Sequence, residues 1–170
     1  MSRWRSGRPD GPLTPLGAGV ALGVVILDQL AKLAAVTWLP EGQGFDILPI
    51  LALFRTTNTG IAFSFLAGSG PALIVLTVAI AAVVIAFWVR TSDGGKLTAI
   101  AYALILGGAV GNLADRARLG YVVDFLFLHL GDRTLFVFNL ADAALTLGPC
   151  LLIAVHLFPE NRKAEGEPEQ

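Results

Sequence analysis

Asp124 and Asp142 are the two residues of this chain whose positions most favour chemistry. Asp124 lies in the segment V-V-D-F, and Asp142 lies in F-N-L-A-D, at the start of an apolar run where an ionised group is costly to keep. Two carboxylates held together cannot both ionise easily, so they share one proton and titrate as a pair. The ionised member can take a proton from water while the other donates to a carbonyl oxygen, which hydrolyses an amide bond. The sequence permits this contact without establishing it.

No other group in the sequence competes for the role of nucleophile or metal ligand. Ser64 and Ser69 have no neighbouring histidine pattern, and H-E-x-x-H is absent. His129 and His156 lack ligand spacing, so we expect no metal and no cofactor. Cys150 is the only cysteine, which excludes an intrachain disulfide, and its apolar neighbours predict a small buried side chain.

Membrane-spanning helices are the elements that must position the two aspartates. The chain has 170 residues, of which 55% are hydrophobic and 15% charged, whereas a soluble domain carries about 25% charged residues. A hydrocarbon core of about 30 Å requires about 20 helical residues. Four stretches are long enough: 16–39, 71–89, 97–114 and 139–158. We therefore predict an all-α membrane protein, a four-helix bundle, and no basic cluster indicates nucleic acid as a partner.

The first stretch could also be a cleaved secretory signal, because arginines precede its apolar run. That run continues past Asp28 to Trp38 without a clear small-residue cleavage site, so we predict that it is retained. The expected organisation is a cytoplasmic N-terminal tail (1–15), a single membrane-embedded domain (16–158) and a disordered cytoplasmic tail (159–170).

The distribution of lysine and arginine predicts that both termini are cytoplasmic. The two tails and the link between the second and third spans contain Arg3, Arg5, Arg8, Arg90, Lys96, Arg162 and Lys163. The other two connections contain fewer cations, namely Arg55, Arg116, Arg118 and Arg133. We expect the first outer connection, 40–70, to be partly ordered. The second contains Y-V-V-D-F-L-F-L and T-L-F-V-F, which predict a hairpin or small β-sheet at the membrane surface.

This orientation brings most of the unusual polar residues to the outer face of the membrane. Asn112, Asp115 and Arg116 are spaced i, i+3 and i+4, so they share one helix face. Asn139 and Asp142 are again three residues apart, near the start of the fourth span. Glycines 107, 108 and 111 precede Asn112 and would let a neighbouring helix or the substrate approach closely.

Each of these residues also has a purely structural interpretation. Asp28 and Lys32 are four residues apart, and a salt bridge that fastens helices is a better explanation for them than catalysis. Asparagines at this depth form hydrogen bonds between helices, and Asp115 with Arg116 could anchor a helix end. Asp124 alone could be a solvated loop carboxylate, and Asp142 could interact with a helix dipole.

Five segments together resemble the lipoprotein signal peptidase family, also called signal peptidase II. They are L-D-Q-L-A-K, N-T-G-I-A-F-S, G-G-A-V-G-N-L-A-D-R, V-V-D-F and F-N-L-A-D, which begin near Asp28, Asn58, Gly107, Val122 and Phe138 and follow the family's order. Each segment alone is weak, but five in order are highly specific. The chain has Ile61 where the family often has alanine, which affects packing near the site rather than the chemistry.

The resemblance implies the fold, the reaction and the site residues. It implies a four-helix membrane bundle with a small extracytoplasmic β-sheet, in the bacterial cytoplasmic membrane. Asp124 and Asp142 would be the catalytic dyad, and the implied substrate is a diacylglyceryl-modified prolipoprotein cut just before its lipidated cysteine. The residues implied to position or support substrate and dyad are Asn112, Arg116, Asn139, Asn58, Asp115 and Gly108, with Asp28 and Lys32 structural. Membrane lipids are the other expected partners, and we expect a monomer.

Two other classes of function remain open from the residues alone. A small proton-coupled transporter would use Asp28, Lys32, Asp115 and Asp142 as a relay, but a relay should distribute ionisable groups through the membrane depth. A membrane scaffold would have no need for Asp124 in a hairpin opposite Asp142. The clustering at one face favours a peptidase.

Overall fold

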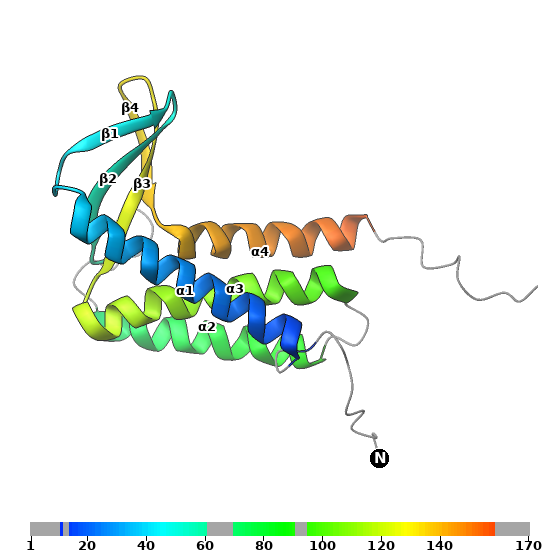
Figure 1. The fold of residues 1–170 in the computed structure, drawn as a ribbon. Coiled ribbons are helices and arrows are strands. Elements are labelled where there is room, and N and C mark those ends of the chain that lie inside the picture. The colour runs from blue at the N-terminus through cyan, green and yellow to red at the C-terminus, as the bar shows by residue number, and fades with distance from the viewer. Residues whose placement is uncertain (1–10, 12–13, 61–69, 91–94, 159–170) are drawn as a thin grey trace, which may run out of the picture.

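The computed structural model describes residues 11, 14–60, 70–90 and 95–158, and long helices form its larger part (Figure 1). The helices are α1 (Pro15–Trp38), α2 (Gly70–Arg90), α3 (Gly95–Leu119) and α4 (Leu140–Leu157). All four are long and apolar enough to cross a membrane. The predicted four-helix membrane bundle is therefore confirmed. Both terminal tails, the link between α2 and α3, and Ile61, Ser64 and Ser69 lie wholly or largely outside the described residues.

The ends of the helices follow from local capping. Thr14 caps α1, because its hydroxyl accepts the backbone N–H of Gly17 at 3.2 Å and Pro15 follows at a position that needs no N–H donor. α3 continues past residue 114, where the predicted span ends, to Leu119. It ends at Gly120, whose φ of 80° is easy only for glycine. Asp115 and Arg116 therefore belong to the last turns of α3.

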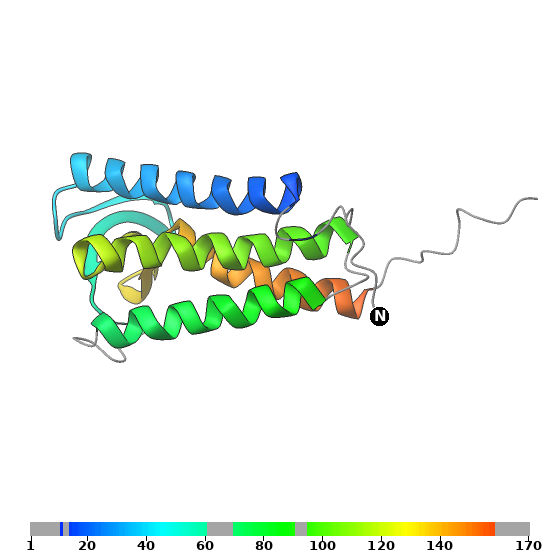
Figure 2. The ribbon, with the colours of Figure 1, turned by 90° about the horizontal axis from the view of Figure 1, so that it is seen from below.

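α3 is the centre of the bundle. Figure 2 shows it between α1 and α2, and it also packs along α4. Small residues allow this close packing: a Cβ atom on Gly107 would lie 2.7 Å from Cβ of Val24 in α1. Gly148 of α4 is equally restricted, since its Cβ would lie 2.5 Å from a side-chain carbon of Ile105.

A four-stranded antiparallel sheet lies at one end of the bundle, with its strands crossing the direction of the helices (Figure 1). The strands are β1 (Gly44–Leu48), β2 (Leu51–Asn58), β3 (Val122–Leu130) and β4 (Arg133–Phe138), in that spatial order. The predicted hairpin is confirmed as β3 and β4. The first outer connection, which was expected only to be partly ordered, supplies β1 and β2.

The pairing of β2 with β3 joins the two outer connections. Asn58 at the end of β2 is opposite Val122 at the start of β3. In the same register, Asp124 of β3 is opposite Thr56 of β2, so Asn58 lies beside the part of β3 that contains Asp124. Residues far apart in the sequence therefore meet where α3 ends and α4 begins.

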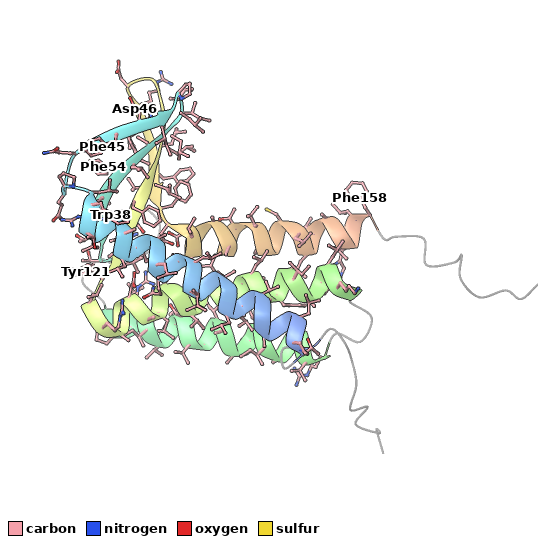
Figure 3. The ribbon with its side chains drawn as sticks, in the orientation of Figure 1. Trp38, Phe45, Asp46, Phe54, Tyr121 and Phe158 are labelled. Atoms are coloured by element: carbon pink, nitrogen blue, oxygen red, sulfur yellow. The ribbon has the colours of Figure 1, made fainter. Side chains whose placement is uncertain are left out.

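The outer surface of the helices is apolar, as lipid contact requires. Trp38 is 78% exposed, and Figure 3 shows it with Tyr121 at the sheet end of the bundle, while Phe158 lies at the opposite end. Tryptophan and tyrosine favour the interface between membrane and water, so these positions agree with a membrane around the helices. The prediction that Cys150 is buried is wrong, because its side chain is exposed on α4. A membrane helix can expose apolar residues to lipid, so an apolar run does not imply burial within the protein.

Candidate active site

Asp124 lies on β3 and is almost completely buried, with 2% exposure. Its carboxylate accepts two hydrogen bonds, from Nδ2 of Asn58 to Oδ2 at 3.0 Å and from Nδ2 of Asn139 to Oδ1 at 2.6 Å. Burial raises the pKa of Asp124 to about 6, and the negative charge of Asp142 adds to this increase. The hydrogen bonds from the two asparagines oppose it, because they favour the ionised carboxylate.

The raised pKa of Asp124 predicts a pH-dependent stability. The carboxyl holds its proton up to about pH 6 in the folded protein, but only to about pH 3.8 in the unfolded chain. The folded state therefore binds more protons in this window, so the free energy of unfolding falls as the pH rises through it, by about 3 kcal/mol at most. We expect the melting temperature of the native protein, relative to that of Asp124→Asn, to decrease from about pH 4 to about pH 6. A constant difference over this range would contradict the raised pKa.

Asp142 lies in the first turn of α4, at the base of the sheet. Its Oδ1 accepts a hydrogen bond from Nδ2 of Asn112 in α3 at 2.7 Å. Its backbone N–H donates to Oδ1 of Asn139 at 2.9 Å, so Asn139 is the N-cap of α4. The side chain is half-buried, which leaves it access to a neighbouring cavity.

Two asparagines connect the two carboxylates. The amide nitrogen of Asn139 that donates to Asp124 also lies 3.3 Å from Oδ1 of Asn112. The amide nitrogen of Asn112 then donates to Asp142. Asn112 and Asn139 are 5% and 0% exposed, so this connection is shielded from solvent. The structure therefore connects Asp124, Asp142, Asn58, Asn112 and Asn139 in one group of hydrogen-bonded side chains, an arrangement that the sequence permitted.

A cavity of about 800 Å³ lies beside Asp142, between α2, α3, α4 and β4. Its polar residues are Asn58, Asn112, Arg116 and Asp142, with the hydroxyls of Thr77 and Thr146 further along. The remaining lining is largely apolar and includes Leu73, Leu76, Ile80, Ala109, Leu145 and Leu147. A cavity with one polar end and apolar walls suits an amphipathic ligand whose polar part lies at Asp142.

Arg116 lies at the polar end of this cavity. It comes from α3, one turn after Asn112, and its Nη2 donates to the backbone carbonyl of Gly60 at 2.9 Å. Its charge interacts with those of Asp142 and Asp124. It can therefore hold a peptide backbone near the carboxylates by further donation from its guanidinium.

Lys32 lies behind the two carboxylates, in α1. Its Nζ is 2.8 Å from Oδ2 of Asp28, which confirms the predicted ion pair. It is also 3.0 Å from Oδ2 of Asp115 and donates to Oδ1 of Asn112 at 3.0 Å. Asp28 accepts the backbone N–H of Ala141 at 2.9 Å and so joins α1 to the start of α4. These buried charges connect α1, α3 and α4 directly beneath the candidate site.

Asp115 fastens α3 to the sheet. Its Oδ2 accepts the backbone N–H of Val123 at 3.2 Å, one residue before Asp124. Its Oδ1 accepts a hydrogen bond from Nε2 of Gln29 at 3.0 Å. Oε1 of Gln29 in turn accepts a hydrogen bond from Nη2 of Arg118 at 3.0 Å. Sequence reasoning did not include Gln29 among the site residues. Its amide in L-D-Q-L-A-K, directly after Asp28 in an apolar span, is the signal that could have indicated it.

Gly108 supports the packing of α3 against α4 and does not line the cavity. A Cβ atom there would collide with the carbonyl oxygen of Ala141 and would lie 2.9 Å from Cγ of Leu145. Gly111 is next to the same turn, where a Cβ would lie 2.8 Å from Oδ2 of Asp28. These two glycines let α3 approach the first turn of α4, which carries Asp142.

No group of three or more His, Cys, Asp and Glu suited to a metal ion occurs among the residues that the structure describes. The absence of a metal from the reaction stays a prediction.

A sequence model of the family described as signal peptidase (SPase) II matches residues 20–158. This chain belongs to the signal peptidase II family. It is therefore a hydrolase, an aspartic-type peptidase, in a bacterial membrane. The predicted family is thus confirmed, and membership of a peptidase family argues against the transporter and scaffold alternatives.

Similar proteins span most of this signal peptidase II chain. The lipoprotein signal peptidase of Mesorhizobium japonicum is 41% identical over 135 residues, which cover 79% of this chain and 80% of that protein. That of Brucella ovis is 44% identical over 135 residues, covering 79% and 84%. Two solved structures are described as bacterial membrane enzymes determined by the in meso method, at 2.3 and 1.9 Å resolution. Their TM-scores are 0.79 and 0.77, with 29% and 28% identity, and the matches cover 92% and 91% of this chain and 96% and 100% of theirs.

Proposed function

We propose that this chain removes the signal peptide from diacylglyceryl-modified prolipoproteins and cuts just before the lipidated cysteine. Family membership supports the substrate class, because the relatives are named lipoprotein signal peptidases. One observation carries the assignment of the catalytic pair: Asp124 and Asp142 are joined through the amides of Asn139 and Asn112, and Asp142 lies at the polar end of an apolar cavity.

In the proposed reaction, Asp124 and Asp142 act on one water molecule. The ionised member takes a proton from the water, whose oxygen attacks the scissile carbonyl carbon, while the other member donates its proton to the carbonyl oxygen. The tetrahedral species then collapses, the carbon–nitrogen bond breaks, and the leaving nitrogen receives a proton from the dyad. The products are a new carboxyl group on the signal peptide and a free amine on the lipidated cysteine.

The residues around the dyad have separate parts in this proposal. Asn58, Asn112 and Asn139 donate hydrogen bonds to the two carboxylates and hold them in position. Arg116 binds the substrate backbone near the dyad. Asp115 supports the start of β3, and Gly108 lets α4 approach α3.

Both the substrate and the cavity favour entry of the substrate from the membrane. The apolar walls between α2 and α4 suit acyl chains and an apolar signal helix. We propose that both termini are cytoplasmic and that the sheet and the dyad lie at the extracytoplasmic face, as the distribution of lysine and arginine predicts. The tails and the single membrane-embedded domain of residues 16–158 are part of the same proposal, and so is a monomer.

The cleavage of a precursor peptide with and without its diacylglyceryl group tests the proposed substrate. We expect kcat/KM to be at least about 100-fold higher for the lipidated peptide, since burying each methylene group contributes about 0.8 kcal/mol. The two peptides would share one sequence and one detergent, so that only the lipid differs. Equal cleavage of both peptides would contradict the proposed substrate class but not the assignment of the catalytic dyad.

Treatment with a chelator tests the proposal that the dyad acts without a metal. We expect turnover to stay within about twofold of the untreated enzyme, because the two carboxyl groups supply both proton transfers. Activity should be followed on the lipidated peptide after dialysis against the chelator. Loss of turnover that a divalent ion restores would contradict the proposal.

A further inference from the structure

Three asparagines surround the proposed dyad, and the orientation of each amide decides what it offers to the carboxylate. An asparagine amide has an oxygen that only accepts and a nitrogen that only donates, and the two ends have nearly the same shape. An amide turned the wrong way would present its oxygen to a carboxylate and repel it. Something must therefore fix the orientation of Asn58, Asn112 and Asn139.

In each case the amide oxygen faces a group that can only donate. Oδ1 of Asn58 accepts the backbone N–H of Gly60 at 3.0 Å, and Oδ1 of Asn139 accepts that of Asp142 at 2.9 Å. Oδ1 of Asn112 accepts the ammonium of Lys32 at 3.0 Å. Backbone N–H and ammonium groups have no acceptor atom, so these contacts direct all three NH₂ groups toward the carboxylates.

Lys32 differs from the other two donors because it comes from another helix. Gly60 and Asp142 lie two and three residues from the asparagines that they orient, so the local backbone supplies those contacts. Lys32 in α1 is 80 residues from Asn112 in α3. Without Lys32, the other donor to this oxygen is Nδ2 of Asn139 at 3.3 Å, and that nitrogen already donates to Asp124 at 2.6 Å.

The buried ammonium uses all its donors. Lysine carries three N–H groups, and Nζ of Lys32 has three close partners: Asp28 at 2.8 Å, Asp115 at 3.0 Å and Asn112 at 3.0 Å. An ion pair that only fastens helices needs the two carboxylates and not the third contact. Lys32 is 3% exposed, so water does not substitute readily for any of them.

We infer that Lys32 is a positioning residue for peptide cleavage, which holds the amide of Asn112 so that its NH₂ group faces Asp142. The inference rests on the proposed function, because it assigns this role relative to the proposed dyad. Lys32 does not touch the reacting atoms and acts only through Asn112. The other charged groups that interact with it are Asp28 from α1, Asp115 from α3, Asp124 from β3 and Asp142 from α4.

The test must remove the ammonium without leaving a charge unpaired, because a lone buried carboxylate would destabilise the fold. Lys32→Gln combined with Asp28→Asn removes both charges of the pair, and Asp115 keeps Arg118 as its cation at 3.7 Å together with its bonds to Gln29 and Val123. A glutamine amide can accept as well as donate, so Asn112 is then free to turn. We expect kcat on the lipidated peptide to fall about 10- to 100-fold, with KM within about threefold, since a hydrogen bond to a charged group is lost.

Two further variants separate positioning from packing. Lys32→Arg keeps a group that only donates, so we expect it to restore kcat to within about fivefold of the native enzyme. Asp28→Asn alone is the matched control: it removes the ion-pair partner but leaves the contact from Lys32 to Asn112. Its kcat per folded molecule should stay within about threefold.

The double variant with Lys32→Gln and Asp28→Asn is called the neutral pair. If the neutral pair folds and has native kcat, the inference is wrong. If it does not fold, the inference is also wrong, because Lys32 would then act only through helix packing. Equal losses of kcat in the control Asp28→Asn and in the neutral pair would overturn it as well. Measured in parallel, Asp124→Asn and Asp142→Asn separate this failure from failure of the proposed function. Turnover by either of those variants would contradict the assignment of the dyad. If both are inactive while the neutral pair is active, only the role proposed for Lys32 is contradicted.

Discussion

Asp124→Asn and Asp142→Asn are each expected to lower kcat on a lipidated precursor peptide by at least about 1000-fold, which corresponds to about 4 kcal/mol of the barrier. An amide in place of either carboxyl removes one of the two proton transfers, and the remaining member cannot perform both. Because the two residues act as a unit, the double variant should be no slower than either single variant. The measurement is single-turnover cleavage followed by mass spectrometry.

Glu41→Gln is a suitable control for the removal of an acidic group. Glu41 pairs with Arg55 at 3.2 Å and its side chain is 61% exposed, whereas Asp124 is buried. It should retain native kcat, and thermal unfolding should show that all variants are inserted and folded. Substantial turnover by Asp124→Asn or Asp142→Asn in a folded protein would contradict the assignment of the dyad.

Asn139 should show the second large effect, because it both caps α4 and donates to Asp124. Asn139→Ser keeps a capping oxygen for the backbone N–H of Asp142 but loses the NH₂ group. We expect this variant to lose at least about 100-fold in kcat while its melting temperature stays close to that of the native protein. The loss follows from the hydrogen bond of 2.6 Å that positions the Asp124 carboxylate.

Thr14→Ala is the converse control, since Thr14 caps α1 far from the dyad. Removing that cap should lower the free energy of unfolding by about 1 kcal/mol and leave kcat unchanged. The two variants thus separate the capping of a helix from the positioning of a carboxylate. If Asn139→Ser retained kcat, the hydrogen bond from Asn139 to Asp124 would not be needed for cleavage, and Asn139 would be only a cap.

The parts of the site that depend on local spacing could be predicted from the sequence. Asp28 and Lys32 are four residues apart on one helix, so any helical conformation brings them together. The same holds for Asn139 and Asp142 at the start of α4. The β3–β4 hairpin was predictable because two β-favouring runs flank a short polar turn.

Contacts between elements could not be predicted in this way. The bond from Lys32 to Asn112 depends on how far α1 is displaced along α3, which the glycines of α3 set through close packing. β1 was missed because every residue in it is exposed, so no alternation of buried and exposed positions marks it. β2 pairs with β3 although α2 and α3 lie between these strands in the sequence, and no local pattern specifies that register.

A single turnover in H₂¹⁸O tests most directly whether the two aspartates activate water. The account predicts ¹⁸O in the new carboxyl group of the released signal peptide and none in enzyme peptides that contain Asp124 or Asp142. Label in either aspartate after turnover would show attack by an enzyme carboxylate on the substrate, and would contradict the account.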